Sequence, residues 1–165
     1  MKTRLKNSIL AAVVAFVALS CEYNGIAEQQ ANIPQTQWHK DSIIPLLLPV
    51  DDTFSTCAVL LTLRCTDDYP YNNIILSVTT TAPSGISVCD TVEYRLMGDK
   101  GWYGKIGGTW IDSRLEFRTG VRFPQHGAYR FDIAHLMRHE KLPGVGAIGV
   151  RIERMEEAPG TGQPQ

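Results

Sequence analysis

A strict alternation of apolar and polar residues governs the centre of this chain. The apolar side chains of the run R-L-E-F-R-T-G-V-R-F share one phase, and they are Leu115, Phe117, Val121 and Phe123. The charged side chains take the opposite phase, and they are Arg114, Glu116, Arg118 and Arg122. A period of two is that of a β-strand with one buried face. The chain is therefore constrained to strands that cover a common core.

The same period recurs in four further segments, at residues 57–65, 92–96, 129–133 and 148–152. Segments 44–50 and 73–81 are more evenly apolar or β-branched, which is typical of central strands. Turn sequences such as A-P-S-G and G-D-K-G separate these segments. Seven or eight short antiparallel strands separated by such turns predict an all-β fold, an antiparallel β-sandwich of the jelly-roll type.

One segment predicts a short helix. Residues 133–140 read I-A-H-L-M-R-H-E, and Pro143 and Gly144 follow. A helix here would cap one end of the sandwich and would place His135 and His139 on one face. Because no third ligand follows at a fixed spacing, we expect these histidines to be solvated side chains, and the sequence predicts no metal site.

The first twenty residues have the features of a secretory leader. Three cations precede an apolar run from residue 9 to about residue 19, which is shorter than the ~20 residues of a membrane-spanning helix. The run ends in L-S-C, which resembles the end of a bacterial lipobox. That resemblance implies cleavage before Cys21 and a covalent lipid on its thiol.

These features divide the chain into four parts. Residues 1–20 form the signal peptide, and residues 21–37 have too few large apolar side chains to be more than a lipidated, flexible tether. Residues 38–154 form one sandwich domain, and residues 155–165 form an acidic, then Pro/Gly-rich, disordered tail. The formal net charge of −1 falls to −4 when the leader and its three cations are removed. A domain without a basic stripe is not suited to nucleic acid.

Three cysteines remain besides Cys21, an odd count for an oxidising compartment. Cys57 and Cys65 would lie roughly 26 Å apart in one strand, too far to bridge each other. Either could pair with Cys89, and three free thiols are the equal alternative.

The sequence contains none of the catalytic or nucleotide-binding motifs that we searched for. No G-x-S-x-G occurs, and G-W-Y-G-K-I-G-G at residues 101–108 does not match the G-x-G-x-x-G fingerprint of nucleotide-binding loops. The sequence therefore predicts a protein without enzymatic activity, catalytic residues or a cofactor.

Aromatic side chains in or beside loops are the remaining candidates for function. We select four of them as candidate partner contacts: Tyr69, Tyr71, Trp102 and Trp110. Exposed Trp and Tyr are typical of protein interfaces and also stack on sugar rings. Large rings that plug the ends of a sandwich are the third interpretation.

An ordered series of motifs resembles a known family. The motifs are Y-P-Y-N-N-I-I-L-S-V (69–78), D-T-V-E-Y-R-L (90–96), G-W-Y-G-K-I-G-G (101–108), V-R-F-P-Q-H-G-A-Y-R-F (121–131) and L-P-G-V-G-A-I-G-V-R-I-E (142–153). From about Trp38 through Glu153 the chain resembles the GldH family, the gliding-motility-associated lipoproteins of Bacteroidota. The family supplies no catalytic or ligand residues, and Cys57, Cys65 and Cys89 are not part of its pattern.

The resemblance implies a lipid-anchored outer-membrane protein that supports gliding motility and is linked to the secretion machinery delivering surface adhesins. Its partners would be envelope proteins of that machinery and the membrane itself. Lipoproteins of these bacteria that reach the cell surface often carry several acids after the lipidated cysteine, whereas only Glu22 follows Cys21 here. We therefore expect the periplasmic face. The alternative function is a carbohydrate-binding envelope lipoprotein.

Overall fold

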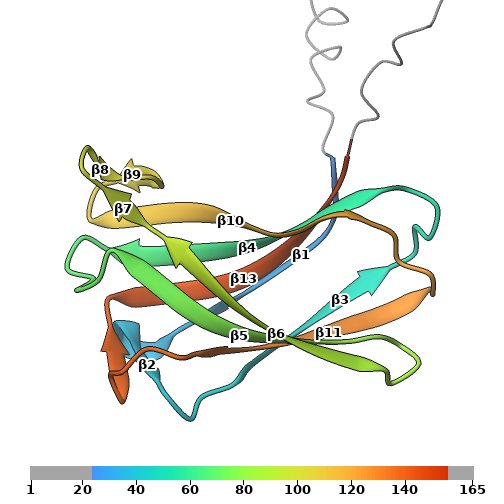
Figure 1. Ribbon diagram of the computed structural model, residues 1–165, viewed down its shortest axis with the longest axis horizontal. Coiled ribbons are helices and arrows are strands. Elements are labelled where there is room, and N and C mark those ends of the chain that lie inside the picture. Colours follow the sequence, from blue (N-terminus) through green and yellow to red (C-terminus); the bar gives the residue numbers. More distant parts are fainter. Residues whose placement is uncertain (1–23, 156–165) are drawn as a thin grey trace, which may run out of the picture.

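Two antiparallel sheets packed face to face form the body of the molecule (Figure 1). The computed structural model describes residues 24–155. One sheet holds, in spatial order, β1 (Gly25–Asn32), β13 (Val145–Arg154), β4 (Cys57–Thr66), β10 (Trp110–Val121) and β9 (Lys105–Gly107). The other holds β3 (Ile44–Val50), β11 (Gly127–His135), β5 (Asn73–Thr81) and β6 (Ser87–Arg95). Two small ribbons pair β2 (Gln37–His39) with β12 (Lys141–Pro143), and β7 (Met97–Gly98) with β8 (Gly101–Trp102).

The order of the long strands is that of a jelly roll. In chain order the long strands of the described residues are β1, β3, β4, β5, β6, β10, β11 and β13. The first sheet pairs the first, eighth, third and sixth of these, and the second pairs the second, seventh, fourth and fifth. This interleaving is two Greek keys wrapped into one sandwich. The predicted all-β jelly-roll sandwich is therefore confirmed.

The core lies between the sheets and follows the alternation of the sequence. Every second residue of β4 is buried, and these residues are Cys57, Val59, Leu61, Leu63 and Cys65. In β10, Leu115 is buried while Arg114 and Glu116 are exposed. The second sheet contributes Phe131 and Ile133 of β11 and Leu76 of β5.

Strand β3 lies at an edge of its sheet, so the expectation of a central strand at residues 44–50 is wrong. Its sequence I-P-L-L-L-P-V alternates in burial, with Leu46, Leu48 and Val50 inside. Pro45 and Pro49 are compatible with an edge strand. Proline has no backbone N–H to donate, and an edge strand has only one neighbour that needs hydrogen bonds from it. Segment 73–81 is an interior strand, as expected.

The helix predicted at residues 133–140 is absent from the structure. Strand β11 continues through His135, and the backbone N–H of Leu136 donates to the carbonyl of Ile75 at 2.8 Å. Burial alternates through Ile133, His135 and Met137, so this segment follows the period of a strand. The ladder with β5 outweighs a helical pattern only two turns long. Within residues 24–155 the helical structure is the short 3-10 turn η1 (Pro34–Thr36).

The flexible tether predicted for residues 21–37 is wrong from residue 25 onward. Residues 25–32 form β1, which pairs with β13 from Gly25↔Glu153 to Asn32↔Ala147. Mostly polar residues suit this edge position because a strand needs only one paired side and modest burial. The signal peptide, Cys21 and residues 156–165 lie outside the described residues. No helix among residues 24–155 is long and apolar enough to cross a membrane.

The three described cysteines are free thiols. Cys57 and Cys65 are buried at opposite ends of β4, and Cys89 is exposed on β6. Burial raises the pKa of Cys65 to about 12, which keeps that thiol protonated. A hydrogen bond from the Ser77 hydroxyl lowers the pKa of Cys89.

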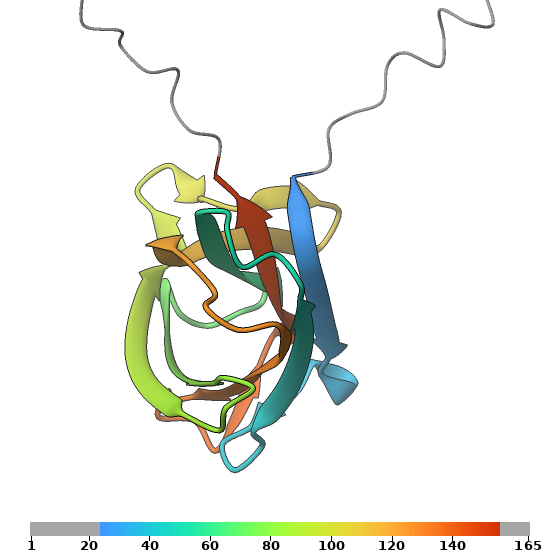
Figure 2. The same ribbon diagram turned by 90° about the vertical axis from the view of Figure 1, so that its right-hand side faces the viewer.

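The strand order gives the sandwich two different ends. At one end, β1 begins and β13 ends, together with the connections 51–56, 82–86 and 122–126; we call this the termini end. The connections 33–43, 67–72, 96–109 and 136–144 lie at the other, which we call the aromatic end. Figure 1 shows the termini end at the right, and Figure 2 looks onto it.

Adjacent leucines of β3 test the burial pattern. Leu48 is 0% exposed and Leu47 is 55% exposed. Leu48→Ala should lower the free energy of unfolding by about 2–5 kcal/mol, because it leaves a cavity between the sheets. Leu47→Ala should cost roughly 0.5 kcal/mol or less. Denaturant unfolding of both variants measures the difference, and equal losses would contradict the assigned register.

Thiol reactivity tests the assignment of free cysteines. Iodoacetamide should modify Cys89 in the folded protein, because it is exposed and has the lowered pKa. Cys57 and Cys65 should react only after unfolding. Mass spectrometry of alkylated peptides reads the order, and a peptide containing Cys89 in disulfide linkage would contradict it.

Candidate interaction surface

Tyr69, a predicted contact residue, is buried at the aromatic end. Its hydroxyl donates to the carbonyl of Asn73 at 2.9 Å. Gly144 makes room for it: a Cβ there would lie 2.8 Å from the Tyr69 Cα, and the φ of +81° also favours glycine. Burial raises the pKa of the Tyr69 hydroxyl. The expectation that Tyr69 is an exposed contact is therefore wrong, and its ring is part of the core.

Two other predicted residues cover the Tyr69 ring. Tyr71 meets it edge-on with ring centroids 6.0 Å apart, and Trp102 lies tilted against it at 6.4 Å. Tyr71 also hydrogen-bonds through its hydroxyl to Nδ1 of His139. Tyr71 and Trp102 are half-buried and His139 is exposed. We call Tyr69, Tyr71, Trp102 and His139 the aromatic cluster. Three connections of the aromatic end supply it: 67–72, 96–109 and 136–144.

Trp110, the fourth predicted residue, lies outside the aromatic cluster on the outer face of the first sheet. Its ring covers Gly146 of β13, where a Cβ would come within 2.4 Å of the indole. The Arg64 guanidinium stands over the same ring, 5.9 Å from its centroid. Trp110 is half-buried. The structure thus joins three of the four predicted residues and separates the fourth.

A polar groove of about 500 Å³ lies on the outer face of the first sheet, near the aromatic end. Its lining includes Glu28, Arg64, Lys105, Asp112, Arg114 and Tyr103. Arg64 donates twice to Asp112, from Nε at 2.6 Å and from Nη2 at 2.9 Å, and this contact lowers the pKa of the Asp112 carboxyl. Tyr103 is 65% exposed and forms part of the wall.

His135 was expected to be solvated and is instead buried beneath Trp38. The two rings meet edge-on at 5.4 Å, and His135 Nε2 lies 3.0 Å from the Trp38 carbonyl oxygen. Burial lowers the pKa of His135, so the ring is neutral at physiological pH. Among residues 24–155 no group of three or more His, Cys, Asp or Glu side chains could hold a metal ion.

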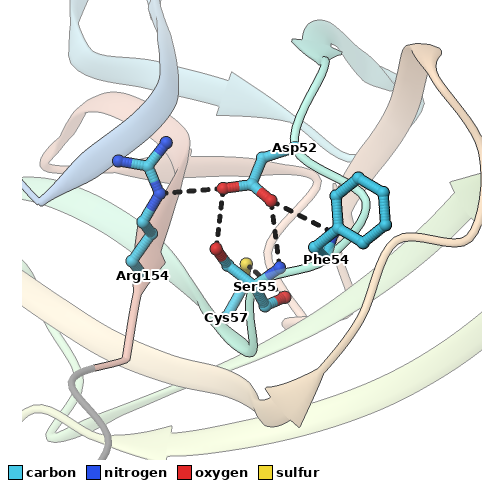
Figure 3. Close-up of polar contacts among 5 residues, drawn as sticks. All are labelled: Asp52, Phe54, Ser55, Cys57 and Arg154. Atoms are coloured by element: carbon cyan, nitrogen blue, oxygen red, sulfur yellow. Dashed lines mark hydrogen bonds and ion pairs between the residues drawn. The ribbon is translucent and has the colours of Figure 1, made fainter.

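At the termini end, Asp52 organises the connection 51–56 (Figure 3). Its carboxylate accepts hydrogen bonds from the backbone N–H groups of Phe54 at 3.1 Å and Ser55 at 2.9 Å. It also accepts from the Ser55 hydroxyl and from Arg154 Nε, both at 2.8 Å. These donors, Ser55 first, hold the pKa of Asp52 far below its usual range. Sequence patterns gave no signal for this link because Arg154 is distant in the chain.

Comparisons with known proteins give one consistent family. The profile described as GldH lipoprotein matches residues 25–152, which is nearly the whole sandwich. The chain belongs to the GldH lipoprotein family. It is 32% identical over 161 residues to the gliding motility lipoprotein GldH of Flavobacterium johnsoniae, covering 93% of this chain and 99% of that protein. The GldH homolog of Christiangramia forsetii is 28% identical over 145 residues, 83% of this chain and 88% of that protein.

Solved structures add little to this GldH assignment. A carbohydrate-binding module of family CBM28, described as specific for non-crystalline cellulose, aligns over 79% of this chain and 75% of its own, with 11% identity. Its TM-score is 0.43, too low to support an inference about fold or ligand.

Acid titration tests the Asp52 link. A carboxylate whose pKa is lowered on folding stabilises the fold above its ordinary pKa of 3.8, and this contribution is lost as pH falls below that value. Asp52→Asn should therefore lower the denaturation midpoint at about pH 7, and the difference from wild type should shrink toward about pH 2.

Asp51→Asn is the matched control because it removes a neighbouring, exposed carboxylate of the same connection. Its denaturation midpoint at about pH 7 should stay close to that of the wild type, as expected for an exposed surface substitution. A difference for Asp52→Asn that stays constant over the whole pH range would contradict the assigned role.

Proposed function

We propose that this GldH family member is a lipid-anchored, non-enzymatic assembly component of the outer membrane. It supports gliding motility and the secretion machinery linked to it, and it binds envelope proteins through its aromatic end. The observation that carries this proposal is the family match across residues 25–152, and two relatives named as gliding motility proteins agree with it.

The anchor in this proposal is a covalent lipid on Cys21, and the membrane face is the periplasmic one. Support comes from the sequence order of basic leader, apolar run, Ser20 and Cys21, and from membership of a lipoprotein family. Two or more acyl chains on one cysteine hold a protein firmly to a bilayer, whereas one chain holds it only weakly. The lipid is the attached group; the proposal includes no other cofactor.

The two ends of the sandwich suit a scaffold. The described chain begins at Asn24, beside the last strand, and the aromatic cluster lies at the opposite end (Figure 1). Strand β4 runs between these ends with ten residues, about 33 Å. An anchor attached at the termini end would therefore hold Tyr71, Trp102 and Tyr103 away from the bilayer. Confinement to a surface also raises the effective concentration of these residues toward membrane-bound partners.

The absence of enzymatic activity in the proposal is supported by two polar arrangements among residues 24–155. The buried histidine is neutral and contacts a backbone carbonyl, and Arg64 and Asp112 neutralise each other. Neither arrangement pairs a nucleophile with a base.

A second candidate function is carbohydrate binding, and the polar groove favours it. The groove combines an exposed tyrosine ring with carboxylate and guanidinium groups that could hydrogen-bond to sugar hydroxyls. Trp110 can report occupancy because its ring lies 5.9 Å from the guanidinium of Arg64, a lining residue of the groove, and Trp102 directly precedes the lining residue Tyr103. Glycan titration followed by tryptophan fluorescence separates the two functions, since the protein scaffold should show no change.

Partner capture in living cells tests the proposed function. Trp102→Ala and Tyr103→Ala should each reduce the yield of crosslinked envelope proteins, because they remove apolar area at the aromatic end. Cys21→Ala should abolish capture of membrane-bound partners. Mass spectrometry of the crosslinked material identifies what is captured.

Leu47→Ala is the control variant, since it removes an exposed apolar side chain from the flank of the sandwich, 55% exposed against 65% for Tyr103. Tyr103→Ala guards against a folding defect in Trp102→Ala, because Tyr103 contributes little to the core. Unchanged capture by both aromatic variants, with lipidated wild-type protein present, would contradict the assigned surface.

A further inference from the structure

Phe54 is the most exposed large hydrophobic residue at the termini end, with 85% of its side chain accessible. It lies in the connection 51–56 between β3 and β4. A single exposed apolar side chain is ordinary on a protein surface. The inference therefore depends on how this ring is held and on what lies beside it.

The connection that carries Phe54 is fixed by polar contacts. Asp52 accepts hydrogen bonds from the backbone of Phe54 and Ser55, from the Ser55 hydroxyl and from Arg154. Figure 3 shows the phenyl ring on the side of this network away from Arg154. The backbone that carries the ring is therefore held in place, so little backbone order would be lost when the ring is buried by a partner.

The end of β13 links the same connection to the first described residue of the chain. The backbone N–H of Arg154 donates to the Asn24 carbonyl at 2.9 Å, and that of Met155 donates to the Thr56 carbonyl at 2.9 Å. Cys21 precedes Asn24 by three residues, a span of at most about 11 Å. A lipid on Cys21, which is part of the proposed function, would bring this end of the sandwich to the bilayer surface.

We propose that the connection 51–56 docks on the lipid bilayer and that Phe54 inserts into its interfacial region. A ring of this size contributes favourable transfer energy at the boundary between headgroups and acyl chains. The charges nearby permit this contact: Arg154 offsets Asp52, and the exposed Arg122 guanidinium stands beside Thr56 to meet lipid phosphates. Asp51 is the exposed acid of the same connection, so the contact depends on apolar insertion more than on anionic lipid.

A second attachment point would restrict the orientation of the domain. The lipid on Cys21 alone would leave the sandwich free to turn about a short linker. With Phe54 inserted as well, the long axis would point away from the bilayer and present the aromatic end to partners. The inference thus adds a lipid-contacting residue and a fixed orientation to the proposed function.

Spin-label accessibility measures the depth of residue 54 directly. Mature lipidated protein is reconstituted into vesicles of phosphatidylethanolamine and phosphatidylglycerol, with Cys89→Ser removing the exposed native thiol. Phe54→Cys carries the nitroxide in one sample. Ile106→Cys on β9 is the matched control, since Ile106 is 67% exposed and lies toward the opposite end (Figure 1).

The expected result is loss of collision with a water-soluble nickel reagent at position 54, with retained access to oxygen, while position 106 remains open to nickel. If the labels at both positions remain open to nickel while the protein is bound to vesicles, the inference is overturned and the anchor is unaffected. A label at 54 shielded from both reagents would also overturn it, in favour of a protein contact. Mass spectrometry that finds no lipid on Cys21 would overturn the proposed function and this inference together.

Discussion

The hydrogen-bonded ladder between β1 and β13 is the constraint on which the arrangement of the molecule depends. It joins the first and last strands of the described chain, so both leave the sandwich at one end. The apolar face of β4 then fixes its register against β13 and β10 on either side. If β4 slipped by one residue along these neighbours, Leu61 and Leu63 would turn from the core to the solvent. The termini end is thereby separated from the aromatic end, and the proposals about attachment and binding depend on that separation.

Most of the fold was predictable from period-two patterns, because burial on one face of a strand is a local property of the sequence. The segments at 57–65 and 148–152 appear as strands with the expected faces inside, and the segment from residue 114 is a strand through Val121. The predictions were wrong where hydrogen bonding to a neighbouring strand decides the local structure and the sequence pattern is ambiguous. Residues 25–32 have little apolar character and are held as a strand by β13, and residues 133–135 join β11 because β5 offers a ladder.

The candidate surface was predictable only in part. Residue type and loop position singled out Tyr71 and Trp102, but they could not show that the two residues share one end of the sandwich or that Tyr69 is buried beneath them. That outcome depends on Gly144, whose missing Cβ leaves space from a distant part of the chain. Trp110 looked equivalent in sequence and covers Gly146 on the sheet face instead. The Asp52 to Arg154 contact had no sequence signal at all, since it joins two strand ends far apart in the chain.

In the arrangement we propose, one end of the sandwich meets lipid and the other meets protein. The most direct measurement places a photoreactive phenylalanine analogue at position 54 or position 103 in living cells and identifies each adduct by mass spectrometry. Both sites are exposed aromatic residues, so the substitution is conservative at each. We expect discrete envelope proteins from position 103 and lipid adducts from position 54. Protein adducts from position 54 together with none from position 103 would contradict it.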